Sequence, residues 1–90
     1  MNKAIITVVG QDTVGIIARV CTYLSQHGVN VLDISQTIID GFFNMMMIVD
    51  YGGADEEFSA MVGDLDSIGE DIGVRIRCQR EEIFTRMHRV

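Results

Sequence analysis

The sequence predicts an α+β fold in which two helices lie on one face of a four-stranded antiparallel sheet. Strand-like and helix-like apolar patterns follow one another along the chain in the order β-α-β-β-α-β. An Asp40-Gly41 pair stands between two strand-like runs, which is a strong signal for a two-residue hairpin. With 90 residues, no proline and no low-complexity linker, the chain has room for one domain only.

The first strand and the first helix occupy the first third of the chain. Residues 4–9 are apolar and mostly β-branched, which is typical of a strand buried on both faces, and Gly10 ends this run. Apolar residues then recur at helical spacing, and they predict a helix from about residue 14 to residue 26. The His27-Gly28 pair that follows is typical of a helix C-terminus. The buried face of this helix is predicted to comprise Ile16, Ile17, Val20, Cys21 and Leu24.

Two strands joined by the Asp40-Gly41 turn are predicted next. Residues 29–40 alternate between β-branched and polar side chains, and residues 42–49 are almost entirely apolar. Because successive side chains of a strand point to opposite faces, the second of these strands presents apolar groups on both faces of the sheet. One face is expected to carry Phe42, Met46 and Ile48, and the other Phe43, Met45, Met47 and Val49.

A second helix and a last strand complete the pattern. The acidic run 55–57 precedes the helix, where negative charge interacts favourably with the helix dipole. After Gly73, residues 74–79 alternate as a half-buried strand. Helices and strands match at ~20 Å in length, so residues 1–80 are expected to form a ferredoxin-like βαββαβ sandwich. The apolar face of the second helix is predicted to be Phe58, Met61, Val62, Leu65 and Ile68.

The predicted sheet has one face that its own helices leave uncovered. An uncovered apolar face on a soluble chain usually marks an interface. Residues 81–90 form an amphipathic C-terminal tail that is too short to be a stable helix alone. We expect this tail to dock as a short helix on the open face of its own sheet or of a partner's sheet. A protein without residues 81–90 that stayed monodisperse and equally stable would contradict this. The apolar positions of the tail are Ile83, Phe84, Met87 and Val90.

Composition and charge restrict the functional class. Hydrophobic residues make up 48 % of the chain and charged residues 22 %, as in globular domains. No apolar run approaches the ~20 residues of a membrane helix, and the N-terminus has no signal-peptide pattern, so we expect a cytoplasmic protein. The net charge of −6 argues against nucleic acid or an anionic membrane as the main partner, because phosphate binding needs a basic face.

The charge is distributed unevenly along the chain. Residues 1–30 carry two basic side chains and one acid, residues 31–72 carry ten acids and no base, and residues 73–90 carry five arginines and two acids. An acidic centre and a basic end suit pairing within the chain or across a homodimer. For any single residue, a solvated surface charge is the simpler interpretation.

No set of cysteines, histidines or acids predicts catalysis, a metal or a cofactor. Cys21 and Cys78 are too few and too far apart for a disulfide framework or a metal site, and we interpret both as core residues without a redox role. His27 and His88 are interpreted as a helix-terminal residue and a tail residue. Acids such as Asp64 are interpreted as part of a solvated helix face. We therefore expect that the protein is not an enzyme.

The turn between the first strand and the first helix, Gly10-Gln11-Asp12-Thr13-Val14-Gly15, is the most informative segment for function. Its glycines allow a tight backbone, and the N-terminus of the helix presents unpaired N–H groups that attract a carboxylate. Asp12 can hold an ammonium group, so the turn offers both partners that an α-amino acid needs. The structural alternative is that Asp12 or Thr13 caps the helix and Gly10 ends the strand.

The same segment carries a resemblance to a known family. Gly10-x-Asp12-x-x-Gly15-Ile16-x-Ala18, followed by Leu24-x-x-x-Gly28-Val29-Asn30-Val31-x-Asp33-Ile34-x-Gln36, resembles an ACT domain. The resemblance covers essentially the whole chain. It is strongest to stand-alone bacterial ACT-domain proteins, to the glycine-cleavage repressor and to the N-terminal domain of formyltetrahydrofolate deformylase.

The resemblance implies a regulatory module that binds an amino acid between paired domains. In the family, the ligand lies against the loop after the first strand and against the start of the partner's second strand. The sequence thus predicts a small regulatory homodimer that binds an amino acid or a related metabolite. The alternative is a ligand-free dimeric module that binds another protein. Carried over to this chain, the ligand-binding positions are Gly10, Gln11, Asp12, Thr13, Val14, Gly15, Asn30 and Val31.

Overall fold

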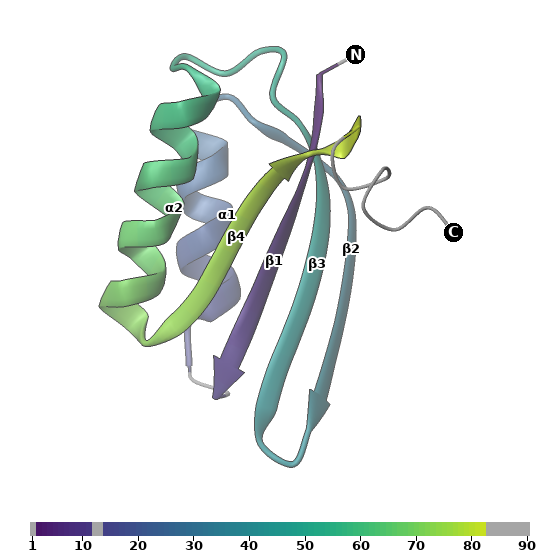
Figure 1. The fold of residues 1–90 in the computed structure, drawn as a ribbon, viewed down its shortest axis with the longest axis vertical. Coiled ribbons are helices and arrows are strands. Elements are labelled where there is room, and N and C mark those ends of the chain that lie inside the picture. The colour runs from purple at the N-terminus through teal and green to yellow at the C-terminus, as the bar shows by residue number, and fades with distance from the viewer. Residues whose placement is uncertain (1, 12–13, 83–90) are drawn as a thin grey trace.

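The computed structural model describes residues 2–11 and 14–82, which follow the predicted order of elements (Figure 1). The antiparallel strands are arranged as β2-β3-β1-β4, and both helices lie on one face of the sheet. The predicted ferredoxin-like βαββαβ sandwich is therefore confirmed. The strands are β1 (Lys3–Gln11), β2 (Asn30–Ile39), β3 (Phe42–Asp50) and β4 (Val74–Arg80), and the helices are α1 (Ile16–Gln26) and α2 (Phe58–Ile72).

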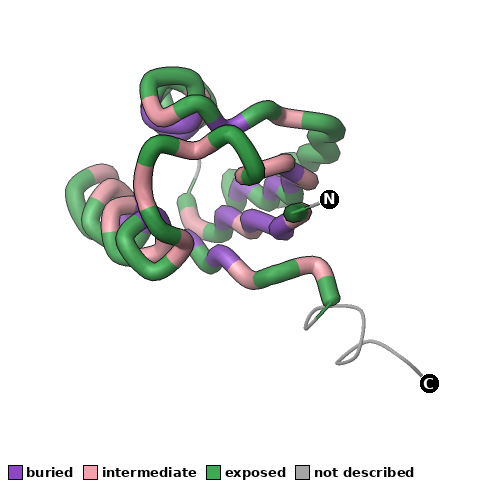
Figure 2. Tube along the Cα trace, turned by 90° about the horizontal axis from the view of Figure 1, so that it is seen from above, coloured by how far each residue is buried: buried purple, intermediate pink, exposed green. Residues whose placement is uncertain are grey.

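The hydrophobic core lies between the sheet and the two helices (Figure 2). Alternate side chains of β1, β3 and β4 point into it, because a strand with one covered face buries every second residue. The thiol of Cys78 is buried there, as predicted for a core residue, whereas Cys21 is only half-buried against the same cluster. The most deeply buried side chains are Ile6, Val8, Ile16, Val20, Leu24, Met47, Val49, Met61 and Leu65.

Nothing within residues 2–11 and 14–82 covers the opposite face of the sheet, as predicted (Figure 1). Phe42 is 52 % exposed on this face, and Met46, four residues further along β3, is also exposed. The expectation that β1 is buried on both faces is wrong at Val9, which is exposed, although Ile5 is buried. The reason is that no helix of the described residues covers this face, so only neighbouring side chains shield β1 there.

The local predictions hold at most turns and fail at the start of α1. Asp40 and Gly41 both have positive φ values, of 52° and 78°, as a two-residue hairpin of the predicted type requires. His27 caps the C-terminus of α1 and Gly73 that of α2, both as expected. Helix α1 begins at Ile16, two residues later than predicted, because Gly15 has a φ of 91° and cannot lie within a helix.

The buried face of α1 also differs in part from the prediction. Ile17 is exposed and Cys21 is half-buried, whereas Tyr23 is buried. The reason is geometric: Ile16, Val20 and Tyr23 repeat at intervals of four and three residues, which places them on one stripe of the helix. The predicted face of α2 is confirmed, with Met61 and Leu65 buried and the other positions packed against the core.

The predicted tail falls largely outside the described residues. Residues 83–90 contain all four of its apolar positions, so its docking on the open face remains a prediction, as does the domain boundary at residue 80. The last described residues, Glu81 and Glu82, are helical and follow β4 directly. The end of β4 contacts α2, because the guanidinium carbon of Arg80 lies 4.4 Å from the ring centre of Phe58.

Candidate functional site

The predicted ligand-binding loop lies at the end of β1 and the start of α1. Gln11 is exposed at the last position of β1, and Val14 is fully exposed next to the helix. Gly15, rather than Asp12 or Thr13, occupies the N-cap position of α1. Asp12 and Thr13 themselves lie outside the described residues, so their role as ligand-binding groups stays a prediction.

Gly10 has a structural role in this loop that is independent of any ligand. A β-carbon at this position would lie 2.8 Å from Cγ1 of Val74 and 3.1 Å from its Cα. Gly10 is paired with Val74 across β1 and β4, so the close approach belongs to the sheet itself. The packing of the two strands therefore requires glycine here, whatever the loop binds.

Asn30 and Val31 lie at the start of β2, beside the C-terminal end of α1. Asn30 is exposed and Val31 is half-buried. Both line a hollow of about 420 Å³, together with Cys21, Ser25, Gly28 and Val29. This volume falls in the ~300–1,000 Å³ range of small-molecule sites.

The two halves of the predicted ligand site lie at opposite ends of the sheet (Figure 1). Asn30 pairs with Asp50, which pairs with Lys3 at the beginning of β1. Gln11 lies at the other end of β1, eight residues after Lys3, and eight strand residues span ~26 Å. One chain therefore does not bring the loop and the start of β2 together around one small molecule.

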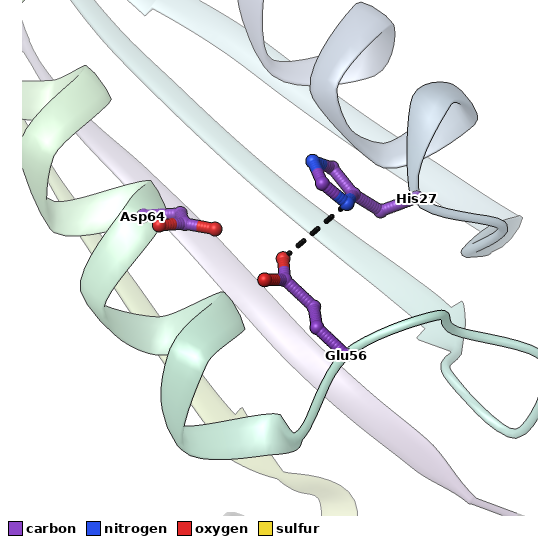
Figure 3. Close-up of side chains that lie close together, drawn as sticks. All are labelled: His27, Glu56 and Asp64. Carbon is purple, nitrogen blue, oxygen red and sulfur yellow. Dashed lines mark ion pairs between the residues drawn. The ribbon is translucent and has the colours of Figure 1, made fainter.

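A separate polar group lies between the C-terminus of α1 and the N-terminus of α2. Figure 3 shows His27, Glu56 and Asp64 pointing toward one another from the end of α1, from the loop before α2 and from α2 itself. One donor atom from each of these side chains lies within 4.8 Å of the other two. These residues are the candidates for metal ligands in the part of the chain that the structure describes.

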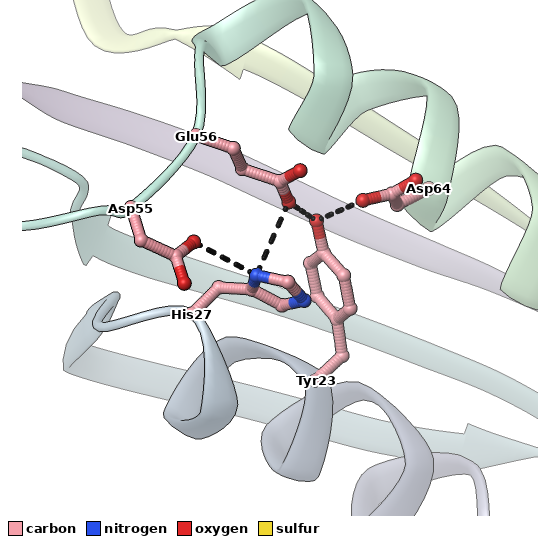
Figure 4. A network of polar contacts seen from close by, with 5 residues as sticks. All are labelled: Tyr23, His27, Asp55, Glu56 and Asp64. Atoms are coloured by element: carbon pink, nitrogen blue, oxygen red, sulfur yellow. Dashed lines mark hydrogen bonds and ion pairs between the residues drawn. The ribbon is translucent and has the colours of Figure 1, made fainter.

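The hydroxyl of Tyr23 links the two carboxylates of this group (Figure 4). It lies 2.7 Å from Oδ2 of Asp64 and within hydrogen-bond distance of Oε1 of Glu56. The side chain of Tyr23 is only 9 % exposed, so both contacts are partly shielded from water. A phenol carries one proton, and it can donate that proton fully to only one of the two carboxylates at a time.

The imidazole of His27 forms the other side of the group (Figure 4). Its Nδ1 lies 2.8 Å from Oδ1 of Asp55 and 3.5 Å from Oε1 of Glu56. Its ring packs against that of Tyr23, with 4.5 Å between ring centres. The backbone also joins the two segments, because the N–H of Asp55 donates to the carbonyl oxygen of His27 at 3.0 Å.

These contacts change the acid–base properties of the group. Burial, and then the hydrogen bonds to Glu56 and Asp64, raise the pKa of Tyr23, so its hydroxyl stays a proton donor. The hydrogen bond to Asp55 raises the pKa of His27 above its ordinary value. The hydrogen bond from Tyr23 lowers the pKa of Asp64, which is therefore an ionised acceptor at neutral pH.

Sequence reasoning missed this group. Asp64 was expected on a solvated helix face, but it is half-buried and accepts a hydrogen bond from Tyr23. Tyr23 was not assigned to the buried face at all. The sequence does contain a pattern that indicates burial of Tyr23, because Val20, Tyr23 and His27 follow the three- and four-residue spacing of one helical stripe.

Among residues 2–11 and 14–82, neither helix is long and apolar enough to cross a membrane.

The sequence profile of the ACT domain family matches residues 2–79. A UPF0237 protein of Bifidobacterium longum is 84 % identical over 90 residues, which cover the full length of both chains.

Solved structures of other proteins also resemble this chain. An ACT domain protein from Streptococcus pneumoniae matches with a TM-score of 0.81 and 38 % identity, over 92 % of this chain and 93 % of that chain. A formyltetrahydrofolate deformylase from Pseudomonas syringae matches with a TM-score of 0.81 over 89 % of this chain and 28 % of its own, and at 20 % identity this likeness concerns the fold alone. The resemblance carried by the first loop and the start of β2 is confirmed: the chain belongs to the ACT domain family, whose members are typically regulatory modules that bind small ligands such as amino acids.

Proposed function

We propose that this protein is a cytoplasmic regulatory homodimer that binds an amino acid or a related metabolite between its subunits, and that it is not an enzyme. The observation that carries the proposal is the separation of the two halves of the site. The loop after β1 and the start of β2 lie at opposite ends of one sheet, so a second copy is needed to bring one half of each chain together.

The outer edge of β2 is the surface best suited to pair with a second copy. From Leu32 to Ile39 every residue of this edge strand is exposed, including Ile34 and Ile38. The other edge strand, β4, instead exposes Arg75 and Arg77, and charged side chains of this kind discourage strand pairing. A long exposed edge strand that carries several apolar side chains favours addition of another strand.

Antiparallel pairing of two β2 strands would assemble the ligand site. In such a pair, the start of β2 in one subunit lies beside the end of β2 in the other. Ile39, at that end, pairs with Phe42, and Phe42 pairs with Gln11 at the beginning of the loop. The Asn30 of one subunit is thereby brought to the end of the partner sheet that carries the loop, and the same holds in reverse by symmetry.

The chemistry of the two halves suits a zwitterion. The side-chain amide of Asn30 offers both a donor and an acceptor. The N-terminus of α1 offers backbone N–H groups to a carboxylate, and Asp12 offers a negative charge to an ammonium group. The hollow beside Asn30 provides space for the rest of the ligand.

The test is a screen of thermal unfolding against the standard amino acids, with hits confirmed by calorimetric titration. A ligand at ~100 times its Kd adds ~2.7 kcal/mol of stability, which raises the midpoint of a domain this small by on the order of 10 °C. Asn30→Ala and Asp12→Ala are expected to lose the response without unfolding. Asn44→Ala, an exposed asparagine on the open face, is the matched control and should keep it.

A ligand-free dimeric module that binds another protein is the second candidate. The observation that favours it is the sheet face that the described residues leave uncovered, where Val9, Phe42 and Met46 are exposed. An intact dimer that no amino acid stabilises would support this function over the first. Retained affinity in both Asn30→Ala and Asp12→Ala would reject the assigned ligand site.

A further inference from the structure

We propose that His27, Glu56 and Asp64 bind one divalent transition-metal ion of the zinc type at the junction of α1 and α2. The three side chains come from the end of α1, from the loop before α2 and from α2, and they converge on one point (Figure 3). This site is distinct from the loop and the β2 strand of the proposed amino-acid site, and the proposal does not rest on that function.

The spacing of the donor atoms fits such an ion. Zn²⁺ binds imidazole nitrogen and carboxylate oxygen at ~2.0–2.2 Å, so neighbouring ligands of a tetrahedral site lie ~3.4 Å apart. Nδ1 of His27 and Oε1 of Glu56 are already 3.5 Å apart. One carboxylate oxygen of Asp64 lies within 4.8 Å of a donor atom of each of the other two side chains, so Asp64 is close enough to serve as the third ligand.

Acidic side chains also outnumber basic ones in this group. Asp55, Glu56 and Asp64 bring three carboxylates together, and within the described residues the only basic side chain paired with them is His27. The hydroxyl of Tyr23 contacts one oxygen of Glu56 and one of Asp64 but can donate its proton to only one of them at a time. The other carboxylate then faces the phenol oxygen without a hydrogen bond. The side chains of Glu56 and His27 are 23 % and 31 % exposed, and partial burial strengthens the repulsion that a cation would relieve.

The ligand chemistry selects the class of ion. A histidine nitrogen with two carboxylates suits Zn²⁺ and its neighbours in the transition series, whereas Mg²⁺ and Ca²⁺ prefer oxygen ligands alone. Oδ1 of Asp55 lies 2.8 Å from Nδ1 of His27. When Nδ1 binds the ion, this exposed carboxylate is close enough to give up its contact with the imidazole and become the fourth ligand. Tyr23 would then orient one of the two carboxylates, Glu56 or Asp64, by donating its single proton to it.

The test uses the full chain, stripped of metal with EDTA and titrated with Zn²⁺ in competition with a coloured chelator. We expect one Zn²⁺ per chain and a higher midpoint of thermal unfolding, with no comparable response to Mg²⁺. His27→Gln should weaken Zn²⁺ binding at least about tenfold, since even second-shell substitutions cost ~10–100-fold. Glu56→Gln should weaken it as well, and serves if His27→Gln fails to fold by circular dichroism.

His88→Gln is the matched control, because His88 is the only other histidine of the chain. It should bind Zn²⁺ as the unchanged protein does. Equal affinity in His27→Gln and the unchanged protein would overturn the proposal, as would an equal response to Mg²⁺, which would indicate a general acidic patch. A thiolate-to-metal absorption band after Co²⁺ substitution would assign the ion to a cysteine and would also overturn it.

Discussion

Gly10 of β1 lies so close to Val74 of β4 that a β-carbon on Gly10 would be 2.8 Å from Cγ1 of Val74. We expect Gly10→Ala to lower the free energy of unfolding by ~1–3 kcal/mol, because part of the contact is with the Val74 backbone and cannot move aside cheaply. Urea unfolding measures the change. Gly63→Ala is the control: it lies in α2, where the added carbon would meet nothing within 4 Å outside the backbone of its own helix, and it should stabilise by ~0.5–1 kcal/mol. A Gly10→Ala protein as stable as the original would contradict the close packing.

Tyr23 gives a second prediction. Removing its hydroxyl leaves Glu56 and Asp64 facing each other without a shared donor. Because hydrogen bonds to charged groups contribute ~1.5–3 kcal/mol, Tyr23→Phe should lower the free energy of unfolding by a similar amount in EDTA-containing buffer. Tyr51→Phe is the matched control and should be nearly neutral, since Tyr51 packs through its ring against Phe58. Equal losses in both variants would show that the Tyr23 hydroxyl contributes nothing specific.

The buried thiol of Cys78 should make the free energy of unfolding decrease at alkaline pH. Burial, and then the charge of Asp66, raise the pKa of its thiol to about 12. The unfolded thiol ionises near ~8.5, so only the unfolded state loses this proton as the pH rises above that value, and the native state is destabilised. Relative to Cys78→Ala, the unchanged protein should lose ~1–2 kcal/mol of stability between pH ~8 and pH ~10. Denaturant unfolding of both proteins at the two pH values measures this loss. If the stability difference between the unchanged protein and Cys78→Ala were the same at both pH values, the burial of this thiol would be contradicted.

The sequence predicted best those features that depend on neighbours along the chain. The turn at Asp40-Gly41 and the helix end at His27 are set by a few adjacent residues, and both were identified correctly. The start of α1 was misplaced because an apolar side chain at Val14 fits the helical pattern, while the backbone of Gly15 does not. Burial of Val9 was overestimated because the apolar pattern of a strand does not show whether anything covers its second face.

The polar group between the helices was beyond local reasoning. Tyr23 is 33 residues from Glu56 and 41 residues from Asp64 in the sequence. Their contact depends on how far α1 and α2 are rotated and shifted against each other on the sheet. Helical periodicity gives the buried stripe of each helix but not this relative placement, so the positions of the carboxylates around Tyr23 could not be predicted.

The edge of β2 that we propose as the subunit interface gives the last prediction. Ile34 lies near the middle of β2 and is 41 % exposed. In a symmetric antiparallel pair the middle residue lies close to its own copy, so Ile34→Glu would set two like charges against each other and remove apolar contact. We expect the dissociation constant of the dimer to rise at least about tenfold, or ~1.4 kcal/mol, and any amino-acid response to weaken with it. Ala60→Glu adds the same charge on the exposed surface of α2 and should remain dimeric in sedimentation experiments. An Ile34→Glu protein that keeps its fold and its dimer would place the subunit interface on another surface.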